Sequence, residues 1–357
     1  MPNLTANDNH TVSFQDYEIL MSYSQIMADP EKNVVCFQPY AGFEKVVSEV
    51  VEKKKLKNLS MEQFQEMAAK FQPLFATKRK LTATRIRNFE NMTTKEIADL
   101  PLESKVDYIE SLFYVGQTRD ELDSLCSTNG DKLKALLSNI TFPKEFWKKE
   151  EALATRFSSL VCSTPQITEG MKNWQNISLD DKKAVIQETA KVIEYVYGAP
   201  IEIGFFTPEE YRKQNNLDDK AHVFGAYAEN GKIFFNTERL EGDNFMGVSV
   251  LFHEFMHKRQ HETDFGNPLI NRLFDSKVYR AHSFEQQETN PTSQAYGDFY
   301  ALMPHEVHAY AMQKFVEDQI VEKTGIRKIQ ENTSDISKSM HEKAFAMSAV
   351  VKCRSTY

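Results

Sequence analysis

The segment HEFMH, from His253 to His257, places two histidines four residues apart and a glutamate directly after the first. On an α-helix, residues at this spacing lie one turn above each other on the same face. Their imidazoles can bind one small cation, and Glu254 can reach a water molecule beside it. The surrounding sequence FMGVSVLFHEFMHKRQH is mostly apolar and predicts a buried helix. Burial of these polar groups is costly unless a partner such as a metal ion satisfies them.

Histidine is concentrated in one part of the chain, because seven of the nine histidines lie between His222 and His308. This density beside carboxylates is typical of a metal or catalytic site. His261 continues the face of His253 and His257, but eight residues of helix rise about 12 Å. Metal–nitrogen bonds are only about 2 Å long. His261 therefore cannot share an ion with His253, and we interpret it as a residue at the rim of the site.

The third ligand is expected on a second helix, within ALMPHEVHAYAMQKFVEDQ at residues 301–319. Pro304 suits the first turn of that helix. His305 and Glu306 point about 100° apart on a helix, so at most one of them faces the metal squarely. Glu306 shares a face with Ala309, whose small side chain would let the two helices pack closely. We predict Glu306 as the third ligand, with His305 as the alternative.

The elements that would position these residues follow a recognisable order. A helix is expected from Leu179 to Tyr197, with Gly198 at its end. The β-rich run IEIGFF at residues 201–206 predicts a strand. HVFGAYA and KIFFNTE flank Asn230-Gly231, a pattern that predicts a β-hairpin. The order is therefore helix, strand, hairpin and the helix that carries HEFMH.

The first part of the chain has a different character. Residues 13–161 carry apolar residues at helical spacing, whereas residues 1–12 are polar and expected to be irregular. We predict an α+β protein in two parts. Residues 1–165 would form an all-helical region of unknown role, and residues 166–357 a domain with a small mixed sheet and C-terminal helices.

HEFMHKRQ and PHEVHAY resemble the two motifs of the gluzincins, zincin metallopeptidases in which a HExxH helix supplies two ligands and a following helix supplies a glutamate. The resemblance is to the HExxHxxQ variant followed by PxExxAY. It covers residues 172–320 and does not extend to residues 1–165. It implies a zincin-like domain in which KIFFN is the edge strand that lines the substrate cleft.

The resemblance and the residues together imply a zinc-dependent metallopeptidase. His253, His257 and Glu306 would hold one Zn²⁺ per chain and leave a position for a water molecule. Glu254 would act as general base on this metal-activated water and pass the proton to the leaving amine of a protein or peptide substrate.

The developing oxyanion would need a hydrogen-bond donor beside the metal. We favour Tyr310 and His308 among the candidates, which also include Tyr296, Tyr300 and His282. Ligand imidazoles commonly donate their second nitrogen to another side chain. The residues predicted for this role are Gln260 and Asp298.

Two alternatives keep the metal and change the function. The chain could be a catalytically inactive zincin-fold protein that serves in binding, or a zinc hydrolase of a non-peptide amide. Glu254 argues against the first, because a purely structural site has no use for a base next to a ligand. The zinc chemistry of the second is the same as that of a peptidase.

Composition excludes some classes of partner. The 357 residues carry a formal net charge of −8, which argues against nucleic-acid binding. No apolar run is long enough to span a membrane, and the N-terminus lacks a secretion signal. The four cysteines occur singly, which fits a reducing compartment. We expect a cytoplasmic protein, or one exported by a Sec-independent route.

Overall fold

A computed structural model describes residues 84–112, 127–214, 226–229, 232–242, 244–274 and 302–327, and two short strands near the N-terminus. The chain divides into two compact units. The first comprises Met1–Leu136 and Ser276–Tyr296, and the second comprises Leu137–Asp275 and Gly297–Tyr357. This division differs from the predicted boundary at residue 165, because about thirty residues before it belong to the second unit.

The described part of the first unit is mainly helical, as expected. It contains α5 (Thr94–Ala98), α6 (Leu102–Leu112) and most of α8 (Gly130–Ser138). The strands β1 (Leu4–Thr5) and β2 (Thr11–Val12) pair antiparallel, where an irregular terminus was expected. The helices predicted within residues 13–83 lie outside the described residues.

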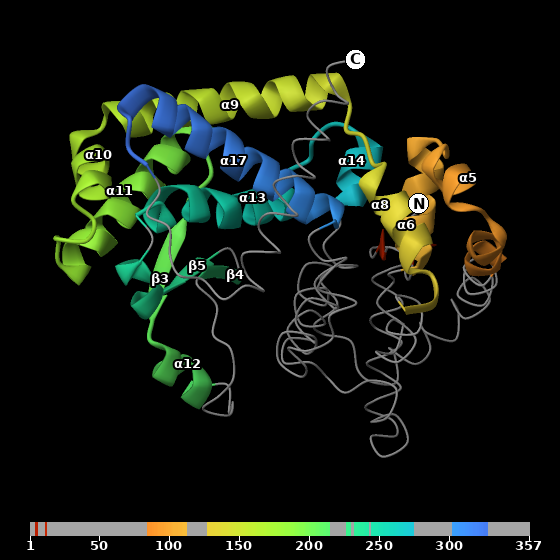
Figure 1. Ribbon diagram of the computed structural model, residues 1–357, viewed down its shortest axis with the longest axis horizontal. Coiled ribbons are helices and arrows are strands. Elements are labelled where there is room, and N and C mark those ends of the chain that lie inside the picture. Colours follow the sequence, from red (N-terminus) through yellow and green to blue (C-terminus); the bar gives the residue numbers. More distant parts are fainter. Residues whose placement is uncertain are drawn as a thin grey trace. The chain divides into compact units, whose positions relative to one another are not determined.

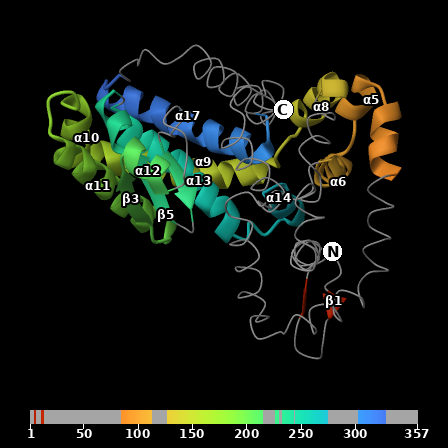
Figure 2. The same ribbon diagram turned by 90° about the horizontal axis from the view of Figure 1, so that it is seen from below.

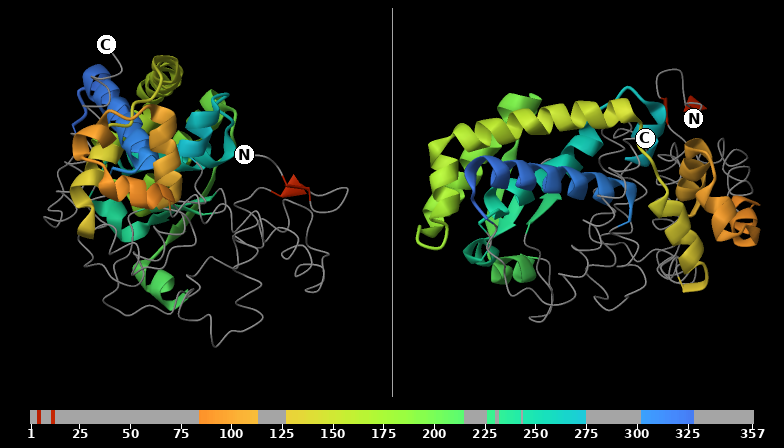
Figure 3. Two further views of the ribbon diagram at one scale, coloured as in Figure 1. Left: turned by 90° about the vertical axis from the view of Figure 1, so that its right-hand side faces the viewer. Right: turned by 45° about the horizontal axis from the view of Figure 1, so that its top comes forward.

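The second unit combines long helices with one small sheet, so the protein is α+β and mostly helical. α9 and α17 lie side by side, and α13 packs against α17 (Figures 1 and 3). The sheet contacts α13 through two of its strands. The elements are α9 (Lys144–Ser163), α10 (Pro165–Lys172), α11 (Leu179–Tyr197), β3 (Glu202–Phe206), α12 (Pro208–Gln214), β4 (Ala226–Glu229), β5 (Lys232–Asn236), the 3-10 helix η1 (Thr237–Glu241), the π-helical turn η2 (Met246–Val250), α13 (Leu251–Glu262), α14 (Pro268–Leu273) and α17 (Pro304–Thr324).

Local sequence determines where the long helices begin and end. Ser178 caps α11 through a reciprocal capping box with Asp181, and Gly198 ends it in the left-handed conformation at φ 67°. Pro304 occupies the first turn of α17, and Gly325 ends that helix at φ 70°. The predicted bounds of α11 and the predicted start of α17 are therefore confirmed.

The sheet has the strand order β3-β5-β4 (Figure 1), and Figure 2 shows β3 beside β5. β4 pairs antiparallel with β5, with Glu229 opposite Lys232, which confirms the predicted hairpin. β3 pairs parallel with β5, with Glu202 opposite Lys232. The expectation that KIFFN is an edge strand was therefore wrong. This strand, β5, is paired on both sides, and β4 and β3 form the edges of the described sheet.

Aromatic contacts fix α13 between its neighbours. Phe252 stacks on Phe157 of α9, with ring centroids 4.7 Å apart. Phe255 makes an edge-on contact with Tyr197 of α11 at 4.9 Å. Both phenylalanines of α13 are almost fully buried. Because their rings point away from the polar face of α13, that face is held in one orientation.

The chain enters α13 through the π-helical turn η2, a feature that often lies close to functional sites. Gly247 allows this turn to approach α11, since a Cβ atom there would come within 3.0 Å of Ile186. Ser249 donates a hydrogen bond of 2.7 Å to Glu317 of α17. The start of α13 is thus tied to both helices.

Within the described residues, no helix is both long and apolar enough to cross a membrane.

Candidate metal centre

The two histidines of HEFMH lie one turn apart on α13, as their spacing predicts. The Nε2 atoms of His253 and His257 are 3.1 Å apart, and the ring centroids are 4.7 Å apart. Both side chains are largely buried, with exposed fractions of 10% and 14%. Their Nε2 atoms therefore face a common point beside the helix.

α17 brings a carboxylate to the same point. Oε1 of Glu306 lies 3.2 Å from Nε2 of His257, and Oε2 lies 3.5 Å from Nε2 of His253. The three ligand atoms lie within 4.8 Å of one another, and these residues form the only such group found among the described residues. The cluster could hold a metal ion, and it contains the three residues predicted as ligands.

The charges of these groups are mutually stabilising. Burial opposes ionisation of Glu306, but the facing His257 and His253 hold the pKa of its carboxyl well below the usual range. Burial likewise disfavours the charged form of His257, yet the Glu306 carboxylate raises its pKa to about 9. A bound cation would take the place of the proton that compensates Glu306.

His305, the alternative third ligand, lies beside the cluster. Its Nε2 is 3.5 Å from Oε1 of Glu306, and its ring centroid is 5.7 Å from that of His257. Burial lowers the pKa of His305 to about 3. Its backbone carbonyl accepts a hydrogen bond of 2.8 Å from Gln260. Glu306, unlike His305, approaches both histidines of α13 through its carboxylate oxygens.

Glu254, the predicted base, lies between the two ligands in the sequence of α13 and is half-buried. Burial raises the pKa of its carboxyl, and the Glu306 carboxylate adds to this effect, while His253 and His257 oppose it. Tyr310 lies one helical turn after Glu306, and its ring centroid is 4.4 Å from that of His253. Burial and the two carboxylates raise the pKa of the Tyr310 hydroxyl, so it stays protonated and able to donate.

His308, the other predicted oxyanion donor, lies away from the candidate ligand atoms. Residues two apart on a helix point about 200° apart, so His308 and Glu306 leave α17 in different directions. The His308 side chain is fully buried, and its Nδ1 lies 2.9 Å from Nε2 of Gln260. Burial lowers the pKa of its imidazole, so the ring is neutral. His308 therefore contacts a neighbour of the ligands and not the ligand atoms themselves.

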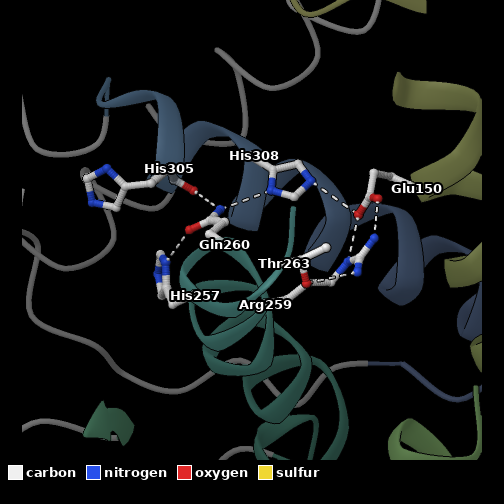
Figure 4. A network of polar contacts seen from close by, with 7 residues as sticks. All are labelled: Glu150, His257, Arg259, Gln260, Thr263, His305 and His308. Carbon is white, nitrogen blue, oxygen red and sulfur yellow. Dashed lines mark hydrogen bonds and ion pairs between the residues drawn. The ribbon is translucent and has the colours of Figure 1, made fainter. Parts of the chain in front are cut away.

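The predicted role of Gln260 as a partner of a ligand imidazole agrees with its position. Its Oε1 lies 3.1 Å from Nδ1 of His257 (Figure 4). The side chain is almost fully buried between α13 and α17. The other predicted partner, Asp298, lies outside the described residues, and so does the side chain of His261. The same holds for three further oxyanion candidates, Tyr296, Tyr300 and His282.

Sequence analysis missed two residues of this network, Glu150 and Arg259. Oε1 of Glu150 accepts a hydrogen bond of 2.7 Å from Arg259, and Oε2 lies 3.6 Å from Nε2 of His308 (Figure 4). Glu150 is only 2% exposed. A signal was present in the sequence, since Glu150 shares the apolar face of α9 with Phe146, Ala154 and Phe157. A charged residue on a buried helix face requires a polar partner.

The likeness to the gluzincins rests on the residues of the two motifs. Comparisons of the chain with protein-family models, with curated proteins and with solved structures found no match. The geometry of His253, His257 and Glu306 therefore supplies the structural argument for a metal centre.

Proposed function

We propose that this protein is a zinc-dependent metallopeptidase. The observation that carries the proposal is the close approach of His253, His257 and Glu306. The two Nε2 atoms are 3.1 Å apart, and the carboxylate oxygens of Glu306 lie 3.2 Å from Nε2 of His257 and 3.5 Å from Nε2 of His253. Ligands about 2.0–2.1 Å from a tetrahedral zinc ion are separated by about 3.3 Å. These three separations are therefore close to the spacing of ligand atoms around a tetrahedral zinc ion.

The donor set favours a catalytic site over a structural one. Structural zinc sites are closed by four protein ligands and often contain thiolates, whereas catalytic sites have three protein ligands and one open position. His253, His257 and Glu306 are three nitrogen or oxygen donors, and no cysteine belongs to the cluster. Bound zinc supplies a Lewis acid that polarises a carbonyl group and lowers the pKa of water.

The chain itself would supply the proton transfer and the charge stabilisation. Glu254 directly follows the ligand His253 in α13, and its carboxylate would accept a proton from the attacking water and pass it to the leaving amine. The Tyr310 hydroxyl, whose ring lies against His253, would donate a hydrogen bond to the developing oxyanion.

A peptide substrate is favoured by the sheet. Among the described residues β4 pairs only with β5, and it packs against the metal-binding helix α13. An edge strand offers unpaired backbone groups to an extended peptide, which would pair as an additional strand. A non-peptide amide would make no use of this edge.

The test is cleavage of a peptide library by the zinc-loaded protein, read by mass spectrometry, with Glu254→Gln as the matched control. We expect cleavage by the wild type and at least a 100-fold loss in Glu254→Gln, with zinc content unchanged. Zinc binding without cleavage above the control would indicate a binding protein or a hydrolase of another amide. Failure of the wild-type protein to bind zinc would refute the proposal.

A further inference from the structure

A chain of polar contacts leads away from the candidate ligands, and its first link is between His257 and Gln260. Nδ1 of His257 lies 3.1 Å from Oε1 of Gln260. If Nε2 of His257 binds a metal, that atom must carry a lone pair, and the ring proton must be on Nδ1. Gln260 then has to present its oxygen to His257. A reversed carboxamide would present its NH₂ group and favour the wrong tautomer.

Two acceptors fix the orientation of the Gln260 carboxamide. Its Nε2 lies 2.8 Å from the backbone oxygen of His305 and 2.9 Å from Nδ1 of His308. A carbonyl oxygen can only accept, so the NH₂ group must face His305. The second hydrogen of this group needs an acceptor in the direction of His308. Nδ1 of His308 serves only if it carries no proton.

Glu150 is the acceptor that faces the other ring nitrogen of His308. With Nδ1 accepting, the proton of the neutral ring is on Nε2, which lies 3.6 Å from Oε2 of Glu150. This buried nitrogen has no hydrogen-bond partner among the described residues, and the Glu150 carboxylate, just beyond hydrogen-bond distance, is the acceptor placed beside it. The carboxylate is held by Arg259 through contacts of 2.7 and 3.3 Å, and it can only accept. The carboxylate at this end and the His305 carbonyl together set the direction of every contact (Figure 4).

We propose that His308 and Glu150 are positioning residues, which orient the Gln260 carboxamide and thereby hold His257 in the tautomer that binds metal. The inference rests on the proposed metal-dependent function and adds residues to it that do not touch the metal. It explains why a buried imidazole stands among aromatic rings, where a nitrogen would otherwise be costly. The ring centroids of Phe274 and Phe146 lie 5.0 and 5.2 Å from that of His308.

The first experiment measures zinc affinity by competition with a chromophoric chelator. His308→Phe suits this test because phenylalanine fits the aromatic surroundings, while Glu150 keeps its partner Arg259. Removal of contacts of this kind typically weakens metal binding about 10- to 100-fold, and we expect a loss in this range. Val161→Ala, a fully buried position on α9 outside the network, is the control for packing and should leave zinc affinity unchanged.

The second experiment reads the tautomer directly, from ¹⁵N chemical shifts of labelled histidine in metal-free and zinc-loaded protein. We expect His308 to carry its proton on Nε2 in the wild type in both states. Glu150→Gln, whose amide can also donate, should allow the other tautomer and weaken zinc binding. If Glu150 served only in packing, Glu150→Gln would change the stability of the protein but neither the tautomer of His308 nor the zinc affinity.

The outcomes separate this inference from the proposed function. Zinc binding by the wild type with unchanged affinity in His308→Phe, or a proton on Nδ1 of His308, would overturn the positioning role alone. Failure of the wild type to bind zinc would overturn both the positioning role and the proposed function. A proton on Nε2 of His308, together with weaker zinc binding in both His308→Phe and Glu150→Gln, would establish that Glu150 and His308 position His257.

Discussion

Glu150 and Arg259 form a two-point ion pair that joins α9 to α13, the helix that carries two of the candidate ligands. Oε1 and Oε2 of the carboxylate lie 2.7 and 3.3 Å from Nη2 and Nε of the guanidinium. Arg259 follows the candidate ligand His257 by two residues, whereas Glu150 precedes Arg259 by 109 residues. A helix outside the recognised motifs therefore contributes directly to the surroundings of the site.

The choice between Glu306 and His305 predicts different zinc contents for two neighbouring variants. We expect about one zinc per chain in the wild type, retention in His305→Ala and loss in Glu306→Ala, because only Glu306 approaches both histidines. Elemental analysis of the purified proteins measures this. The reverse pattern, with zinc lost only in His305→Ala, would assign the third ligand to His305.

Tyr310→Phe should separate catalysis from metal binding. The phenyl ring can keep the 4.4 Å contact with His253, while the hydroxyl is removed. Loss of one oxyanion donor typically lowers kcat about 100- to 1,000-fold, and we expect an effect of this size with zinc content unchanged. Steady-state kinetics on a cleaved peptide provide the measurement. An unchanged kcat would exclude Tyr310 as the donor.

Glu150 should make the free energy of unfolding depend on pH in the acidic range. Burial alone would raise the pKa of its carboxyl, but His308 and Arg259 lower it to about 2, below the usual value of 4.5. A depressed pKa adds stability that is present above the unfolded value and lost as pH falls from 4.5 toward 2. The full contribution is about 3 kcal/mol.

Urea unfolding of the wild type and Glu150→Gln between pH 7 and pH 3 checks this dependence. The difference in unfolding free energy between the two proteins should be constant at neutral pH and should shrink below pH 4.5. A difference that stays the same throughout would show that ionisation of Glu150 does not stabilise the fold.

Phe252→Ala should destabilise the second unit strongly, because it removes a fully buried ring stacked on Phe157. Truncation of a buried phenylalanine costs about 3–5 kcal/mol. Tyr195→Ala, at a position 68% exposed, should cost no more than about 1 kcal/mol. Thermal or urea unfolding compares the two. Equal effects would mean that α13 is not anchored by this stack.

The sequence by itself determined the local elements and the pair of histidines. The ends of α11 at Ser178 and Gly198 follow from side chains within a few residues of the termini. The hairpin follows from Asn230-Gly231 between two apolar runs, and the common face of His253 and His257 follows from helical periodicity. Each of these features is set by interactions between near neighbours in the chain.

The tertiary structure decided which distant segments meet. It placed β5 in the centre of the described sheet, brought Glu306 to both histidines, and turned His308 toward Gln260 and Glu150. It also placed α9 in the same compact unit as the site. Periodicity shows which face of a helix is buried but not which partner covers it, because that choice depends on packing between elements far apart in the sequence.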